Sequence, residues 1–151
     1  MRVSSAFQYV IGDPELNSLI YKSRCTDLAN WDLVESILAS STRNNAANGI
    51  TGVMVFTKTH FLQILEGPFV PLNATFERIA RDTRHEEIQL INFTEINERE
   101  FANWSMHGIG LFDINEELKS KLHSQFGSST KSIRLPTKAS EVKELLDILL
   151  S

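Results

Sequence analysis

The apolar residues of this chain recur in two rhythms, every second position and every third or fourth, which predict strands and helices in turn. Residues 19–24 follow the first rhythm and predict a short strand. Residues 31–47 follow the second and predict a helix, with Asp27 or Asn30 as its N-cap. Gly49 supplies the C-terminal stop of this helix.

The next elements continue the alternation. Apolar strands are predicted at 50–56 and 61–67, and the four residues TKTH between their cores are a connection of hairpin length. Pro68 and Pro71 then open a second helix, whose apolar residues keep helical spacing up to Asp82.

Two further strands, at 87–96 and 105–112, complete the order strand, helix, strand, strand, helix, strand, strand. This is the βαββαββ order of a ferredoxin-like α+β sandwich, with a five-stranded mixed sheet and both helices on one face. Amphipathic tail helices follow at 114–126 and 139–151, separated by the polar linker 127–138. We expect their apolar stripes to cover either the bare back of the sheet or another subunit.

Composition narrows the class of protein. The 151 residues, 42% of them hydrophobic, are enough for one globular core. A net charge of -4 gives no attraction for phosphate backbones or anionic lipids, so neither nucleic acid nor a membrane is an expected partner. No apolar run reaches the roughly 18 residues of a membrane span, and residues 1–16 do not read as a signal peptide. We therefore expect a cytoplasmic protein, in which the single cysteine, Cys25, forms no internal disulfide.

Amide side chains interrupt the apolar pattern at two places. On the first helix, Ile37, Ser41, Asn44 and Asn45 form one stripe that changes from apolar to amide-bearing. The asparagines could bind a ligand or simply solvate the last carbonyls of the helix.

Gln63 is the second interruption, because it faces the same way as Phe61 and Leu65 in its strand. An unpartnered buried amide costs about 1 to 3 kcal/mol, so Gln63 needs a partner, and the hydroxyl of Tyr21 is available. The alternative readings are a purely structural pair or an edge glutamine in water. The histidines show no metal-binding spacing, and GxGxxG and P-loop patterns are absent.

Five motifs, LIYKSR, SSTRNNAANGITG, FLQILEGP, RIARDTRH and WSM, occur in an order and spacing that resemble the BLUF family, blue-light sensors that use FAD. The tyrosine, the double asparagine, the glutamine before LEG and the Trp-x-Met all coincide. The two tail helices further resemble the short, single-domain members. The resemblance implies an N-terminal extension at 1–16, a BLUF FAD-binding domain at 17–112 and a helical tail at 113–151.

The resemblance implies a non-covalent FAD with its isoalloxazine ring between the two helices. Ile37 and Ile79 would sandwich the ring, with Phe61 nearby. Asn45 would hold the carbonyl and imide edge of the ring, with Ser41 close to it. The other implied contacts are to the ring edge, the ribityl chain or the flank of the flavin, and they come from Asn44, Arg78, Asp82, Arg84 and His85.

The resemblance also implies photochemistry without net substrate turnover, so we do not expect an enzyme. Tyr21 would donate an electron and a proton to the excited flavin, Gln63 would rotate or tautomerise, and the pair would recombine. The rearranged amide would shift flavin absorption to the red and bias the fifth strand, where Trp104 and Met106 compete for the place near Gln63. Which of the two lies there in the dark is left open.

The fifth strand leads into the 113–151 tail, which we expect to pass the light signal to a downstream protein partner. The resemblance to short members with such tails also implies a homo-oligomer, either a dimer or a larger ring. Three rival classes of protein remain. A flavoenzyme would turn over a reductant in the dark, and a ferredoxin-like nucleic-acid binder is opposed by the excess of acidic residues. An oligomerisation module would have no use for Tyr21, Asn45 and Gln63.

Overall fold

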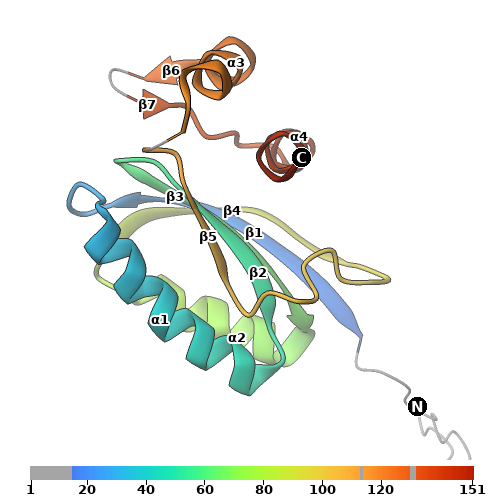
Figure 1. Cartoon of the computed structure of the whole chain (residues 1–151). Coiled ribbons are helices and arrows are strands. Elements are labelled where there is room, and N and C mark those ends of the chain that lie inside the picture. Colours follow the sequence, from blue (N-terminus) through green and yellow to red (C-terminus); the bar gives the residue numbers. More distant parts are fainter. Residues whose placement is uncertain (1–14, 113, 130–131) are drawn as a thin grey trace, which may run out of the picture.

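The computed structural model describes residues 15–112, 114–129 and 132–151 (Figure 1). Its elements are, in chain order, β1 (Leu16–Cys25), α1 (Trp31–Asn48), β2 (Thr51–Phe56), β3 (His60–Pro68), α2 (Phe69–Ala80), β4 (His85–Glu95), β5 (His107–Gly110), α3 (Glu116–Phe126), β6 (Ser128–Ser129), β7 (Ser132–Ile133) and α4 (Ala139–Leu150). Residues 1–14 of the expected N-terminal extension lie outside the described residues, and Leu16 already belongs to β1.

The first five strands form one mixed sheet in the order β4-β1-β3-β2-β5. β1 pairs antiparallel with both β3 and β4, β2 pairs antiparallel with β3, and β5 runs parallel to β2. α1 and α2 lie together on one face of this sheet (Figure 1). The predicted ferredoxin-like α+β sandwich is confirmed.

α1 is capped by a side chain at its start and by a glycine backbone at its end. The side chain of Asn30 accepts a hydrogen bond from the Leu33 N–H at 2.9 Å, so Asn30 rather than Asp27 is the N-cap. Gly49 follows the helix with a φ of 66°, a left-handed conformation that a glycine adopts without the clash of a Cβ.

The fifth strand is shorter than predicted, since β5 spans only His107–Gly110. Residues 105 and 106 precede it, and each accepts a hydrogen bond from a side chain of another element. The Ser105 carbonyl accepts from the Asn45 side chain at 2.7 Å, and the Met106 sulfur accepts from Gln63 at 3.6 Å. The start of β5 is therefore tied to α1 and β3.

Strand alternation gives the sheet two apolar faces. Leu19, Tyr21 and Leu65 pack on the face that the helices α1 and α2 cover. Ile20, Leu62 and Ile64 point to the opposite face, called the back face below. β1 and β3 thus each contribute to two separate layers of core.

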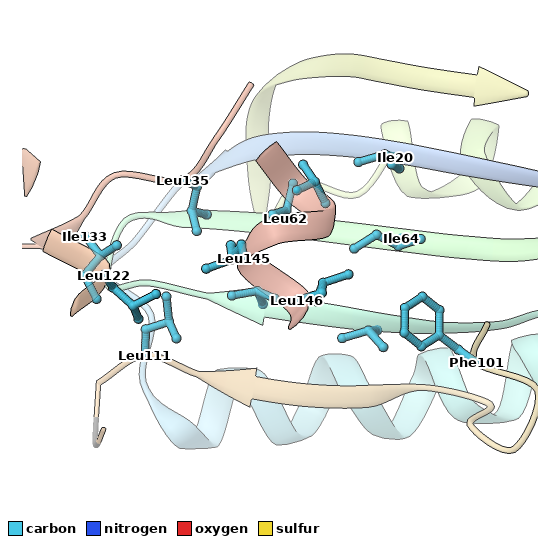
Figure 2. Packing of buried hydrophobic residues seen from close by; sticks show 13 residues of the cluster. Ile20, Leu62, Ile64, Phe101, Leu111, Leu122, Ile133, Leu135, Leu145 and Leu146 are labelled. Carbon is cyan, nitrogen blue, oxygen red and sulfur yellow. The ribbon is translucent and has the colours of Figure 1, made fainter. Parts of the chain in front are cut away.

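α4 covers the back face, which is one of the two positions expected for the tail. Figure 2 shows Leu145 and Leu146 of this helix beside Leu62 and Ile64 of β3. Further buried residues of the same cluster come from α3, from the segment between the tail helices and from the β4–β5 connection: Leu122, Ile133, Leu135 and Phe101. The segment predicted to be a polar linker therefore adds two side chains to this core.

Candidate functional site

A cleft lies between α1 and α2 on the sheet face that they cover. It has two adjoining lobes, of about 350 Å³ and about 600 Å³. The residues that line both lobes are Ser41, Gln63, Ile79, Asp82 and Arg84. The other predicted site residues line one lobe each: Tyr21, Ile37, Phe61 and His85 the first, and Asn44, Asn45 and Arg78 the second. The structure thus brings every predicted cofactor-contacting residue to one cleft.

The floor of the cleft is a row of side chains on three neighbouring strands. Tyr21 of β1 stands opposite Gln63 of β3, and Met54 of β2 stands opposite the same glutamine on its other side. The Tyr21 hydroxyl donates a hydrogen bond to Gln63 Oε1. Gln63 Nε2 donates in turn to the sulfur of Met106, at 3.6 Å. The glutamine, only 1% exposed, is therefore the middle member of a chain from β1 to the start of β5.

Tyr21 is held in its neutral, proton-donating form. Burial raises the pKa of its phenol well above the ordinary value, and the negative charge of Asp82 raises it further. The hydroxyl keeps its proton at any physiological pH and remains the donor to Gln63.

Met106, not Trp104, lies beside Gln63. Trp104 packs against the core of the back face instead. Its ring stacks on Phe101, with centroids 6.0 Å apart and planes at 14°, and on His107, at 4.4 Å and 23°. Trp104 and Met106, the two candidates for the position beside Gln63, therefore lie on opposite sides of the sheet.

Asn45 and Asn44 have different surroundings at the end of α1. Asn45 is buried in the second lobe, where its side chain donates to the Ser105 carbonyl. The Asn44 carbonyl near the helix end accepts from the side chain of Asn48, at 2.6 Å. Solvation of the helix end is thus provided by Asn48 and Gly49, which leaves the Asn45 side chain in the cleft.

Charged residues gather at the end of α2. The guanidinium of Arg84 contacts both carboxylate oxygens of Asp82, at 2.5 to 3.1 Å. These hydrogen bonds lower the pKa of Asp82 and raise that of Arg84, so both groups stay ionised. The partner of Asp82 in this ion pair is Arg84 rather than Arg78, which stands four residues before it.

His85 is buried behind this pair. Its Nε2 lies 2.6 Å from the Ile79 carbonyl, and its Nδ1 lies 2.8 Å from the Ser23 hydroxyl. A carbonyl only accepts, so Nε2 carries a proton, and in the neutral ring Nδ1 accepts from the serine. His85 thereby joins α2 to β1 under the first lobe.

Three residues that line the cleft were not predicted from the sequence: Met54, Ser40 and Thr75. The strand pattern alone could have found Met54, because a hairpin that pairs Phe56 with Phe61 places residue 54 opposite residue 63. Ser40 and Thr75 carry no such signal. In the part of the chain that the structure describes, no group of three metal-ligating side chains is found. Across the described ranges, no helix is long and apolar enough to cross a membrane.

The sandwich and its cleft define a ligand-binding domain with apolar walls and a polar floor. The family model described as sensors of blue-light using FAD, BLUF, matches residues 16–107. The chain belongs to this family of blue-light sensors that bind FAD.

Individual relatives agree with the family. The chain is 29% identical, over 80% of its length, to the blue light- and temperature-regulated antirepressor BluF of Escherichia coli. The chain spans less than a third of the length of the curated relatives it matches. Among solved structures, the dark state of BlrB, a BLUF protein, shares 30% identity and a TM-score of 0.70, over 90% of this chain and 96% of that one. The BlsA ground state shares 28% identity and a TM-score of 0.71, over 89% and 87%.

The residues of the cleft fit a flavin. Ile37 from α1 and Ile79 from α2 offer apolar surfaces to a planar ring. Gln63 and Asn45 offer the donors and acceptors that match its uracil-like edge, and Arg78 offers a positive charge for an anionic phosphate group.

Proposed function

We propose that the cleft holds FAD and that Tyr21 and Gln63 convert blue light into a hydrogen-bond rearrangement, which the fifth strand and the tail pass to a partner protein. The observation that carries the proposal is the continuous chain from the Tyr21 hydroxyl through Gln63 to the Met106 sulfur. It joins a redox-active phenol to an amide with interchangeable ends, and that amide to the entrance of β5.

The proposed contacts follow the lining of the two lobes. Ile37 and Ile79 would sandwich the ring, with Phe61 nearby, and Asn45 would hold its carbonyl and imide edge, with Ser41 close to it. Contacts to the ring edge, the ribityl chain or the flank of the flavin would come from the polar and charged residues Asn44, Arg78, Asp82, Arg84 and His85.

Blue light makes a bound flavin a strong one-electron oxidant. Tyr21 would give an electron and its phenolic proton to the flavin and would take both back afterwards. No substrate would be consumed, so no enzymatic activity is expected. In between, Gln63 rotates or tautomerises. Its amide would then donate to a ring carbonyl, and this new hydrogen bond would shift absorption to the red.

The signal leaves the cleft through residues 104–106. A thioether sulfur is a weak acceptor, so the hydrogen bond from Gln63 to Met106 is easily exchanged for another. The same segment is held by Asn45 through Ser105, and Trp104 reaches the core that α4 covers. We take 104–106 as the bistable element between the cleft and the tail.

In this proposal, residues 17–112 form the light-sensing domain, and residues 113–151 form a tail that passes the signal to the partner. A relative named as an antirepressor supports a protein as the downstream partner. Assembly into a dimer or larger ring is part of the same proposal.

The test is absorption before and after a blue flash, on FAD-loaded wild type, Tyr21→Phe and Gln63→Glu. Wild type should show a reversible red shift. Tyr21→Phe removes the hydroxyl without changing the ring, and Gln63→Glu removes the amide donor, so both should still bind FAD but lose or strongly alter the shift.

Gln89→Glu is the matched control, since it makes the same chemical change at an exposed position of β4. It should behave as wild type. A normal red shift in Tyr21→Phe or Gln63→Glu would refute the proposed chemistry. Oxidation of a reductant by the FAD-loaded protein in the dark, with multiple turnovers, would favour a flavoenzyme instead.

A further inference from the structure

Glu66 is a buried acid on the opposite side of β3 from Gln63. It lies three residues beyond that glutamine, points to the back face and is only 2% exposed. Its two carboxylate oxygens accept separate backbone hydrogen bonds, from the N–H of Glu100 at 2.9 Å and of Phe101 at 2.8 Å. An isolated buried carboxylate is costly, and these two donors are what make it tolerable here.

The same stretch of chain is held a second time by Arg99. Its guanidinium donates to the Glu66 carbonyl at 3.1 Å, to the Gly49 carbonyl at 2.6 Å and to the Thr51 hydroxyl at 2.9 Å. Residues 99–101 are therefore fixed to the end of β3 and the start of β2 by side chains that do not line the FAD cleft. We call Glu66 and Arg99 the anchor.

The anchored residues lie on the path between the cleft and the tail. Phe101 is buried in the back core with Val142 and Leu146 of α4, and these residues share with Glu66 the lining of a cavity of about 510 Å³. Phe101 also stacks on Trp104, two residues before Met106. Movement of 102–106 is thus bounded by Gln63 at one end and by the anchor at the other.

The charged groups near the Glu66 carboxylate do not stabilise it in place of the two N–H donors. Burial raises its pKa, the Glu100 and Phe101 N–H groups oppose that rise, and the charges of Glu100 and Arg99 act in opposite directions. Glu98 and Lys143 line the cavity that it faces. The carboxylate is thus held mainly by backbone donors of the one segment that it anchors.

We propose that Glu66 is a positioning residue for the light signal. It gives the 102–106 segment a fixed end, so that a rearrangement at Gln63 displaces Trp104 and Phe101 against α4 instead of dissipating in a loose loop. This inference rests on the proposed function, and it predicts that loss of the anchor separates the flavin response from the tail response.

The experiment compares Glu66→Gln with Glu98→Gln in the full chain loaded with FAD. Glutamine has the shape of glutamate, but an amide nitrogen replaces one of the two acceptor oxygens, so in the same orientation one backbone N–H group faces a donor. Glu98→Gln makes the same change of charge at an exposed position in the same loop. Two quantities are measured on each sample: the flash-induced red shift, and the light-minus-dark difference in amide hydrogen exchange across 139–150.

In wild type and Glu98→Gln we expect both the red shift and an exchange difference in α4. In Glu66→Gln the red shift should persist, because Tyr21 and Gln63 are untouched, while the exchange difference falls by about twofold to thirtyfold, the range expected for a lost coupling residue. A purely structural role would not produce this split, since it would weaken FAD binding and the red shift together.

An exchange difference of wild-type size in Glu66→Gln would overturn the proposal. So would a red shift without any exchange difference in wild type, whereas a missing red shift in wild type would refute the proposed function instead. If Glu66→Gln does not retain FAD, Arg99→Gln loosens the same segment from the loop side. It should reduce the exchange difference in the same direction, and failure of both variants to bind FAD would make the anchor structural and the inference wrong.

Discussion

Gln63 is hydrogen-bonded unequally at its two ends. Its oxygen accepts from a buried phenol, whereas its nitrogen donates only to a thioether sulfur at 3.6 Å. Exchanging the two ends of the amide therefore loses only a weak hydrogen bond to Met106. The hydrogen bond with Tyr21 determines which orientation of the amide is more stable. The protonation state of Tyr21 is the residue-scale property on which this depends.

The raised pKa of Tyr21 predicts a pH-dependent stability. In the unfolded chain this phenol loses its proton near pH 10, whereas the folded chain holds it more tightly, so above about pH 10 the unfolded state binds fewer protons. The free energy of unfolding of wild type should therefore fall with rising pH above about 10, by up to about 1.4 kcal/mol per pH unit from this group. Urea unfolding at pH 8 to 11 measures it.

Tyr21→Phe is the reference for that measurement, because every other titrating group is shared by the two proteins. The difference in stability between wild type and variant should be constant up to about pH 10 and then change as wild type loses stability. A difference that stays constant to pH 11 would show that the pKa of the phenol is not raised.

At the scale of elements, the site depends on the register of three strands. β1, β3 and β2 place Tyr21, Gln63 and Met54 in one row, and the hairpin between β2 and β3 sets half of that register. The row of Tyr21 and Gln63 could be predicted from strand alternation and from the need of a buried amide for a partner. The side of the sheet taken by Met106 or Trp104 could not, because both precede β5 in irregular backbone held by Asn45 and Gln63.

Gly52 allows β2 and β3 to approach closely. A Cβ at this position would lie 2.1 Å from the Ile64 carbonyl oxygen, a backbone atom that cannot move aside without shifting β3. Gly52→Ala should therefore lower the free energy of unfolding by at least about 1 to 3 kcal/mol and weaken FAD binding, because β3 carries Gln63. Denaturant unfolding and flavin titration check both effects.

Gly49→Asn controls for the loss of a glycine as such. No atom lies within 4 Å of a Cβ at residue 49, and asparagine tolerates its φ of 66° better than other residues. Its cost should stay below about 1 kcal/mol. Equal destabilisation by the two substitutions would contradict the account of close strand packing.

At the scale of the whole molecule, one sheet separates the cleft from the tail. The cleft lies under α1 and α2, and α4 lies on the back face (Figure 1), so β1 and β3 contribute side chains to both layers. The strand and helix order predicted the sandwich, since alternating periodicities identify elements directly. The docking of the tail could not be predicted, because an amphipathic stripe shows that a helix needs an apolar partner but not which one. The dimer or larger ring stays a prediction for light scattering to check.

Leu145 tests whether the tail belongs to the same cooperative unit. It is fully buried between α4 and the back face, so Leu145→Ala should cost about 2 to 5 kcal/mol of stability. Leu150→Ala, at a position 40% exposed at the end of the same helix, should cost less than about 1 kcal/mol. A Leu145→Ala protein as stable as wild type would mean that α4 does not pack on the sheet in solution.

The most direct test of the central claim is the light-minus-dark infrared difference spectrum of the FAD-loaded chain, with wild type compared with Tyr21→Phe. If Gln63 exchanges its hydrogen-bonding ends on illumination, the carbonyl stretch of the flavin ring should move to lower frequency in wild type, recover in the dark, and stay unchanged in Tyr21→Phe. Carbonyl bands that are identical in light and dark in the wild-type protein would contradict the account.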